Sequence, residues 1–422
     1  MTIKPLKRIS GAFDLPGDKS ITHRAIMFNA IAEGEAKIHN ALLGEDCLAT
    51  IECMKKLGAK IGVEDDIVTV VGAKKIKSGQ ELYVGNSGTT MRLLAGLLCG
   101  FGVNAELDGD ESIRKRPMNR IIEPLTLMGA KITSQEGGLA PLKIKGSDLK
   151  GIEYTMPVAS AQVKSSIILA GLNAQTPTTI FEPVKTRNHT ELMLTAQSAD
   201  VKIRKNKIAV SKSSLKSVDV YVPGDISSAS YLMVLATVLK GSGIVLKNVG
   251  VNPTRTGIID IIKFCGGKIT TLNRRRTGEE PVADMLIQSA DNLKPFVIGG
   301  DMIPRLIDEI PILAVLACFA EGTSVIKDAK ELKIKESNRI DSTVNMLKSM
   351  GARVEATEDG MVIYGTGVIM GGKEIDAGLD HRLAMSAAIA GAVSLDGVKI
   401  KNAQIADVSY PDFYKIFERG EY

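Results

Sequence analysis

The chain has 422 residues, which is too many for one ordinary core and indicates about two or three domains. Because 44% of the residues are hydrophobic, we expect a folded rather than a disordered chain. Its five cysteines, an odd number with no CxxC spacing, argue against a disulfide framework or a zinc site, and no apolar run approaches the roughly 20 residues that span a bilayer. The net charge of +5 is a small surplus and only 4% of the residues are aromatic, so we expect a cytoplasmic, unexported monomer with no nucleic-acid or membrane partner.

The first chemically distinctive stretch is a Pro-Gly turn that leads into a predicted helix at residue 19. The first turns of this helix carry Lys19, Ser20, Thr22, His23 and Arg24. A helix start leaves unpaired backbone N–H groups and a partial positive charge, and hydroxyls and cations at the same end favour an anion. A capped surface helix with solvated charges is the alternative for any one such stretch.

Small-residue apolar segments, each opened by a polar or charged group and closed near a glycine, recur six times along the chain. They cover residues 19–34, 87–100, 160–171, 227–241, 307–322 and 381–391. Several are apolar on nearly all sides, which is typical of helices buried all round. A further predicted helix follows most of them and stops before an alternating strand, as at 57–61, 128–132, 197–201, 264–268 and 350–354.

The spacing of these segments indicates the fold class. At roughly 70 residues, and about 85 for the last interval, the repeat is too long for a solenoid. We therefore expect an α+β fold of six small subdomains, three in each of two lobes, with sheets covered by helices on one face. Polar helix starts of both lobes could then face a shared cleft. The basic run Arg274–Arg276 is expected on a solvated loop.

Polar groups open the later helices of the first half as well. Asn86-Ser87-Gly88-Thr89-Thr90 combines hydroxyls with a glycine that permits close backbone approach. Four cations lie within 114–120, around a proline, and arginine suits bidentate contacts with carboxylate or phosphate. Ser160-Ala161-Gln162 opens the third helix, and 186–191 adds Arg187. N-capped buried helices and solvated faces remain the alternatives.

The second half places carboxylates among its cations. Asp308 and Glu309 precede an otherwise apolar helix, and one of them is a candidate base, although both could be capping groups. Glu336 and Arg339 have the spacing of an ion pair on one helix face, which could be a plain salt bridge. The run 380–382, Asp-His-Arg, opens the last buried helix.

No GxxxxGK[ST], HExxH or GxSxG motif is present, so P-loop nucleotide binding, zinc proteolysis and an elbow serine have no support. Nine motifs in order along the chain instead resemble the 5-enolpyruvylshikimate-3-phosphate synthase family of enolpyruvyl transferases. They are LPGDKSITHR, NSGTTMRL, RPM, SAQVKS, RNHTE, GDISSASY, LIDEIPILA, KIKESNR and DHRLAM.

The resemblance implies a two-lobed inverse α/β barrel in which each lobe has three βαβαββ units. The chain would cross between lobes near residues 18 and 225. Lobe 1 would comprise 1–18 and 226–422, and lobe 2 would comprise 19–225 and hold most contacts to shikimate 3-phosphate.

The resemblance also implies a reaction. The enolpyruvyl (carboxyvinyl) group of phosphoenolpyruvate would pass to the 5-hydroxyl of shikimate 3-phosphate by addition and elimination, with release of phosphate and with no metal or organic cofactor. Closure of the lobes would exclude water. This is a step of the shikimate pathway to chorismate and the aromatic amino acids.

Site residues follow from the matching motif positions. Catalytic roles would fall on Lys19, Asp308 and Glu336. Shikimate 3-phosphate would contact Lys19, Ser20, Arg24, Ser160, Ala161, Gln162, Arg187, Asp308 and Lys335. Phosphoenolpyruvate would contact Lys19, Gly88, Arg116, Gln162, Arg339 and Arg382. Further candidates are Asn86, Thr89, His381 and Glu331.

Two other functions compete with this one. A UDP-N-acetylglucosamine enolpyruvyl transferase shares the fold and donor, but it uses a cysteine where this chain has Glu111, and its Lys-Asn pair is replaced by Lys19-Ser20. A non-catalytic protein that binds phosphorylated ligands is the other alternative. Asp308 and Glu336 argue against it, because pure anion binding gains nothing from carboxylates.

Overall fold

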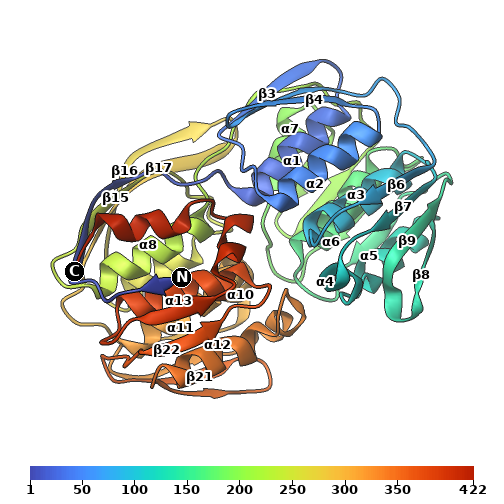
Figure 1. Ribbon diagram of the computed structural model, residues 1–422. Coiled ribbons are helices and arrows are strands. Elements are labelled where there is room, and N and C mark those ends of the chain that lie inside the picture. Colours follow the sequence, from blue (N-terminus) through green and yellow to red (C-terminus); the bar gives the residue numbers. More distant parts are fainter. The chain divides into compact units, whose positions relative to one another are not determined.

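The structure is a computed structural model that describes all residues from 1 to 422 (Figure 1). The chain divides into two compact units. Unit 1 comprises Met1–Pro16, Pro223–Arg276 and Pro281–Tyr422, and unit 2 comprises Gly17–Val222 and Thr277–Glu280. Each unit has its own hydrophobic core. The lobe boundaries expected at residues 18 and 225 stay a prediction.

Unit 2 contains seven α-helices: α1 (Lys19–Ala30), α2 (Glu45–Lys56), α3 (Gly88–Gly100), α4 (Glu111–Arg114), α5 (Asn119–Leu127), α6 (Ala161–Gly171) and α7 (His189–Ala196). Its strands are β3 (Glu35–His39), β4 (Lys60–Glu64), β5 (Ile67–Val71), β6 (Gln80–Tyr83), β7 (Ala105–Asp108), β8 (Lys131–Gln135), β9 (Leu139–Lys145), β10 (Glu153–Thr155), β11 (Thr178–Phe181), β12 (Val201–Arg204), β13 (Lys207–Val210) and β14 (Val220–Tyr221). A short 3₁₀ turn, η1 (Glu136–Gly138), joins β8 to β9.

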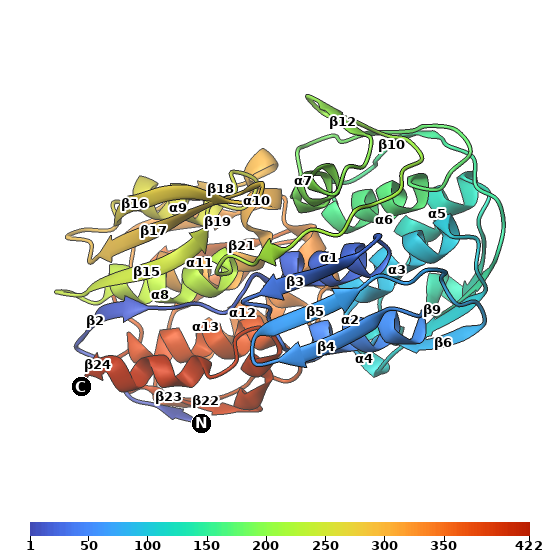
Figure 2. The same ribbon diagram turned by 90° about the horizontal axis from the view of Figure 1, so that it is seen from above.

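The three sheets of unit 2 share one topology. Their strand orders are β14-β3-β5-β4, β6-β7-β9-β8 and β10-β11-β13-β12. In each sheet the first two strands are parallel and the remaining pairs are antiparallel. Figure 2 shows β3, β5 and β4 side by side. A parallel pair needs a crossover connection, and the buried helices α3 and α6 supply it between β6 and β7 and between β10 and β11.

The buried helices of unit 2 approach one another closely because their contact faces carry small residues. Helix α3 packs on α6, and the two ribbons are neighbours in Figure 1. A Cβ atom placed on Gly96 of α3 would lie 2.1 Å from the backbone oxygen of Ser166 in α6. The glycine therefore sets the distance between two helices whose first residues are candidate ligand contacts.

Unit 1 contains the helices α8 (Ile226–Val238), α9 (Gly257–Phe264), α10 (Ile303–Leu306), α11 (Ile310–Cys318), α12 (Arg339–Ser349) and α13 (His381–Ala392). Its strands are β1 (Thr2–Ile3), β2 (Arg8–Phe13), β15 (Gly243–Gly250), β16 (Lys268–Thr277), β17 (Glu280–Gln288), β18 (Val297–Ile298), β19 (Gly322–Ile326), β20 (Arg353–Ala356), β21 (Met361–Gly365), β22 (Lys373–Asp376), β23 (Val398–Lys401) and β24 (Gly420–Glu421). Five 3₁₀ turns complete it: η2 (Gly300–Met302), η3 (Ile307–Glu309), η4 (Lys330–Ile334), η5 (Ala403–Val408) and η6 (Phe413–Arg419).

Two of the three repeats in unit 1 follow the same topology as those of unit 2. The sheet β18-β19-β21-β20 matches it, and β16-β17-β15-β2-β24 matches it with one added edge strand. The third sheet, β1-β23-β22, has only three strands, and the turns η5 and η6 stand where other repeats have a second helix. The predicted α+β repeat with buried helices is confirmed, and the sixth copy departs from it.

Two local predictions are wrong. Arg274–Arg276 lie in strand β16, where they are exposed, rather than in a loop. The sequence shows no alternation of apolar and polar residues there, because neither face of this segment is deeply buried. Glu336 lies ahead of α12, whose N-cap is Asn338, so it does not share a helix face with Arg339, although the two side chains do form an ion pair. Asp308 lies in the 3₁₀ turn η3, ahead of the apolar helix α11, as expected.

Close packing of α3 on α6 gives a testable prediction. Replacement of Gly96 by Ala should lower the free energy of unfolding of the protein by about 1–3 kcal/mol, because the added methyl group overlaps the α6 backbone. Gly62 in β4 is a matched control, since a Cβ there meets nothing within 4 Å. Urea denaturation of both variants is the measurement. Equal stability of G96A and G62A would contradict the close approach.

Candidate functional site

The start of α1 is organised by two aspartates. Asp18 caps the helix, its Oδ1 accepting the backbone N–H of Ile21 at 2.9 Å. Lys19 follows, and its Nζ lies 3.0 Å from Oδ2 of Asp46, a residue in the first turn of α2. The Lys19 side chain is 16% exposed. The contact orients an ammonium group at the helix start.

Arg24, one turn further along α1, is 4% exposed and is oriented by neutral oxygen atoms. Its Nε donates to Thr190 Oγ1 at 2.7 Å, and its Nη2 donates to Ser165 Oγ at 3.0 Å. Its Nη1 donates to the backbone oxygen of Ser20 at 2.9 Å. These contacts tie α1 to α6 and α7 and do not offset the charge of the guanidinium.

The start of α3 gathers several of the residues expected to bind phosphoenolpyruvate. A Cβ atom on Gly88 would lie 2.7 Å from Arg92 Nη1 and 3.1 Å from Arg116 Nη1, so two guanidinium groups crowd this glycine. Arg92 Nη1 also donates to Gln162 Oε1 at 2.6 Å, and Gln162 Nε2 donates to Thr89 Oγ1 at 3.0 Å. The Asn86 backbone oxygen accepts from Arg116 at 3.3 Å.

The remaining shikimate 3-phosphate candidates of unit 2 lie at α6 and ahead of α7. Ser160 caps α6 through a 3.4 Å bond from the Val163 N–H, and Ala161 is the first residue of the helix. Arg187 lies between β11 and α7 and is half-buried. Four expected residues of the first half, Lys19, Arg24, Gly88 and Gln162, are thus placed in or next to the first turns of helices of one unit.

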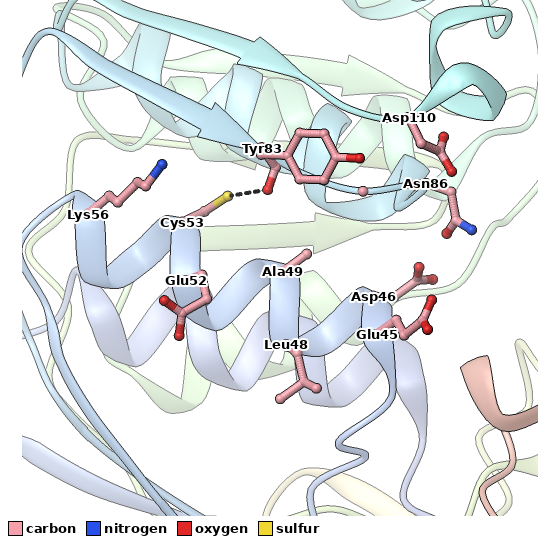
Figure 3. Close-up of a pocket in the computed structure, with 11 residues that line it drawn as sticks. Glu45, Asp46, Leu48, Ala49, Glu52, Cys53, Lys56, Tyr83, Asn86 and Asp110 are labelled. Atoms are coloured by element: carbon pink, nitrogen blue, oxygen red, sulfur yellow. Dashed lines mark hydrogen bonds between the residues drawn. The ribbon is translucent and has the colours of Figure 1, made fainter.

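A cavity of about 430 Å³ lies beside these helix starts (Figure 3). Its lining comes from α2, from the end of β6 and the segment after it, and from the cap of α4: Glu45, Asp46, Leu48, Ala49, Glu52, Cys53, Lys56, Tyr83, Gly85, Asn86 and Asp110. Acidic groups outnumber the single cation, Lys56, so the lining is not suited to an anion. Because Asp46 also binds Lys19, the cavity adjoins the candidate site.

Beneath the starts of α1 and α3, a buried chain of hydroxyl groups ends at a histidine. His23 Nδ1 lies 2.7 Å from Thr50 Oγ1, which lies 2.7 Å from Thr90 Oγ1. Thr90 in turn donates to Oγ of Ser87, the cap of α3, at 2.7 Å. Burial lowers the pKa of His23 to about 3, and the attraction of Asp46 only partly opposes it. His23 is therefore a neutral link between two helix starts.

In unit 1 one buried guanidinium joins three carboxyl groups. Arg339 Nε lies 2.9 Å from Asp380 Oδ2, Nη2 lies 2.6 Å from Glu336 Oε2, and Nη1 lies 3.4 Å from Asp308 Oδ1. Lys335 Nζ lies 3.7 Å from the same Asp308 oxygen. Burial disfavours the charge of Arg339, but the three carboxylates outweigh burial and hold its pKa above the ordinary value.

The same Asp380 caps α13. Its Oδ1 accepts the backbone N–H of Arg382 at 2.9 Å, and the first residues of this helix, His381 and Arg382, are buried. Burial opposes ionisation of Arg382 and also raises the pKa of nearby Tyr231 to about 12, yet the net shift of the Arg382 pKa is upward because negative groups including Asp308 surround it. A positive charge therefore persists at the start of α13.

The other acidic candidate ahead of α11, Glu309, is fully buried, and its Oε1 accepts a hydrogen bond from Ser227 Oγ. Arg255 Nη2 donates to the same serine at 2.8 Å. Glu309 therefore belongs to a structural network at the start of α8. Asp308, 16% exposed at its side chain, is the accessible carboxylate of the pair.

Sequence reasoning missed several partners of the expected residues. Asp46, Arg92 and Asp380 contact Lys19, Gln162 and Arg339 respectively. Asp46 and Asp380 lie at helix starts, where an aspartate predicts only a helix cap and not an ion pair with a cation distant in sequence. Expected Glu331 lies in η4 and expected Ser20 in the first turn of α1, both half-buried.

Two further structural findings concern expectations of absence. The chain contains no group of three or more His, Cys, Asp or Glu side chains arranged to hold a metal ion. None of its helices combines the length and apolar character that a membrane span requires. The expected absence of metal, organic cofactor and nucleic-acid partner, and the expected monomer, stay predictions.

Comparison with solved structures defines the class of the fold. The enolpyruvyl transferase NikO from Streptomyces tendae superposes with a TM-score of 0.80 over 99% of this chain and 96% of its own, at 16% identity. EPSP synthase from Acinetobacter baumannii superposes with a TM-score of 0.87 over 100% of this chain and 97% of its own, at 43% identity. The architecture is thus the two-lobed inverse α/β barrel of enolpyruvyl transferases.

Comparison of sequences then narrows the class to one family. The family model of EPSP synthase (3-phosphoshikimate 1-carboxyvinyltransferase) matches residues 3–417. A 3-phosphoshikimate 1-carboxyvinyltransferase of Thermoanaerobacter sp. (strain X514) is 52% identical over 99% of both chains, and that of Bacillus subtilis (strain 168) is 47% identical over 97% of both. The chain belongs to the EPSP synthase family.

The buried histidine gives a prediction for pH dependence. His23 has an ordinary pKa of 6.5 and a pKa of about 3 in the fold, so between these values the unfolded chain binds more protons and the free energy of unfolding falls as the pH falls. The contribution from pH 7 to pH 5 is about 2 kcal/mol. His23→Asn, which keeps a polar atom near Thr50, should lack it.

Urea denaturation of wild type and His23→Asn at pH 7 and pH 5 measures this difference. The wild type should lose about 2 kcal/mol more than the variant on acidification. An equal loss in both proteins would show that His23 is not held neutral by burial.

Proposed function

We propose that this chain transfers the enolpyruvyl group of phosphoenolpyruvate to the 5-hydroxyl of shikimate 3-phosphate. The chain is an enzyme of the EPSP synthase family. The relatives that it matches over nearly their whole length are named 3-phosphoshikimate 1-carboxyvinyltransferase, which describes this reaction. Both substrates are small anions, so the helix starts and arginines described above suit them.

Shikimate 3-phosphate is assigned mainly to unit 2. Its phosphate would meet Ser160 at the α6 start, together with Arg24 and Arg187, and its ring would lie against Ser20, Ala161 and Gln162. Support comes from Arg24, a cation that contacts with Ser165 and Thr190 orient next to the start of α6. Ala161 offers only its backbone and a methyl group, so any polar contact there is through the main chain.

Phosphoenolpyruvate is assigned to Lys19, Gly88, Arg116 and Gln162 of unit 2 and to Arg339 and Arg382 of unit 1. Support comes from the two guanidinium groups next to Gly88, those of Arg92 and Arg116, since arginine suits contacts with carboxylate and phosphate. Support also comes from the raised pKa values of Arg339 and Arg382, since both remain cationic at any working pH.

With these assignments the proposed reaction has two steps, an addition and an elimination, and each step includes proton transfer. In the addition step the 5-hydroxyl oxygen bonds to the central carbon of phosphoenolpyruvate, the hydroxyl proton passes to a base, and an acid protonates the methylene carbon. In the elimination step the carbon–phosphate oxygen bond breaks, a proton leaves the new methyl group, and the vinyl group re-forms. We assign Asp308, Glu336 and Lys19 to these transfers.

The observation that carries the proposal is the placement of two carboxylates among cations. Asp308 lies 3.4 Å from Arg339 and 3.7 Å from Lys335, and Glu336 lies 2.6 Å from Arg339. A site that only bound anions would be weakened by these carboxylates. A site that must also take up a hydroxyl proton requires at least one of them.

Phosphate release from phosphoenolpyruvate tests the proposal. The wild-type chain should release phosphate when shikimate 3-phosphate is present and not when UDP-N-acetylglucosamine replaces it. Asp308→Asn and Glu336→Gln should lower kcat by about 10²–10⁴-fold, because each removes a proton-transfer group while preserving its shape. The dissociation constant for shikimate 3-phosphate should change far less than kcat.

Three results would overturn parts of this account. Release only with the nucleotide sugar would assign the chain to the other transferase, and release with neither acceptor would favour a binding protein. Loss of binding with unchanged turnover in Asp308→Asn or Glu336→Gln would remove the catalytic role of that residue.

A further inference from the structure

A fully buried lysine that has no part in the chemistry above connects two pieces of the shikimate 3-phosphate site. Lys164 lies on α6, one turn after Ser160, and its side chain is 0% exposed. Its Nζ lies 3.0 Å from Oε1 of Glu182 and 2.6 Å from Oε1 of Glu191. Both carboxyl groups are themselves buried.

The two acidic partners bracket the segment that carries Arg187. Glu182 directly follows β11, and Glu191 lies in the first turn of α7. The second oxygen of Glu182 accepts the backbone N–H of Thr186 at 2.8 Å and the Thr186 hydroxyl at 2.6 Å. Thr186 immediately precedes Arg187, so one ammonium group holds both ends of the segment 182–191.

Burial makes this arrangement rigid. An ammonium group removed from water is tolerated only when its partners remain in place, because an unpaired buried charge is strongly unfavourable. Neighbouring contacts add to the same connection, since Ser165 and Thr190 lie 2.6 Å apart at their hydroxyl oxygens and both bind Arg24. Movement of the 182–191 segment relative to α6 would break several of these bonds at once.

We propose that Lys164, with Glu182 and Glu191, is a positioning cluster that fixes Arg187 relative to the start of α6 and so sets the affinity for the phosphate of shikimate 3-phosphate. The inference rests on the proposed function. Lys164 touches neither substrate in this account. It acts on the distance between Arg187 and Ser160, two groups that must reach one phosphate together.

The cluster is asymmetric, which gives the proposal a distinctive signature. Glu182 accepts three hydrogen bonds, and in Glu182→Gln an amide NH₂ would face donors. Glu191 accepts one bond from Lys164, and its other oxygen, Oε2, has no hydrogen-bond partner. Glu191→Gln keeps an oxygen for Lys164. Glu182→Gln should therefore weaken the binding of shikimate 3-phosphate far more than Glu191→Gln.

The test is calorimetric titration of shikimate 3-phosphate, with steady-state kinetics beside it. Lys164→Met and Glu182→Gln should each weaken binding of shikimate 3-phosphate roughly tenfold, because displaced supporting groups typically cost that much. Glu191→Gln should stay within about twofold of wild type, as should the KM for phosphoenolpyruvate in all three variants, since Gly88, Arg116 and Gln162 are held by other contacts.

A matched control separates positioning from general destabilisation. Leu194→Ala removes a fully buried side chain from the same α7 and leaves the cluster intact. It should lower the melting temperature without weakening shikimate 3-phosphate binding. If Lys164→Met does not fold, Glu182→Gln and the milder Thr186→Val, which removes one bond to Glu182, carry the same test.

The outcomes distinguish the two proposals. A wild-type chain that binds no shikimate 3-phosphate contradicts the proposed function and this inference together. A wild type that binds it, with folded Lys164→Met and Glu182→Gln variants of unchanged affinity, contradicts the positioning cluster alone. Equal weakening by Leu194→Ala, or by Glu191→Gln and Glu182→Gln, also contradicts it.

Discussion

The contact of Arg339 with Asp380, Glu336 and Asp308 is the interaction on which the proposed chemistry of unit 1 depends. A guanidinium that is 3% exposed at its side chain needs carboxylates to offset the cost of burial, and in doing so it fixes their positions. Asp380 is also the cap of α13, so the same contact positions Arg382. Removal of Arg339 would leave the fully buried Asp380 without this cation, which couples the fold of this region to the proposed reaction.

The buried cations of unit 2 differ from one another in the groups that contact them. Arg24 is oriented by hydroxyl and backbone oxygens, and Lys164 by two carboxyl groups. Lys164 is fully buried between its two carboxylates and is held as part of the structure. Lys19, paired with Asp46 but still partly exposed, lies between these cases.

Much of the fold could be predicted from the sequence because the buried helices are apolar on nearly all sides and each is opened by a polar cap. Residues such as Ser160 and Asp225 are indeed N-caps. The incomplete sixth repeat and the strand at Arg274–Arg276 could not be predicted, because neither shows a clear period. The motif positions predicted Gly88, Arg116 and Gln162 as contacts of the same substrate. The pairing of Asp46 with Lys19, 27 residues apart, could not be predicted because it depends on tertiary packing.

The central claim is that cations at the helix starts of unit 2 bind the phosphate of shikimate 3-phosphate, and the affinity of one variant tests it most directly. Arg187→Gln should weaken binding of shikimate 3-phosphate at least about tenfold, as expected for loss of a hydrogen bond between charged groups. Lys185→Gln, which removes an exposed cation two residues away, should leave the affinity unchanged. Equal affinity of Arg187→Gln and wild type, measured by calorimetry, would contradict the account.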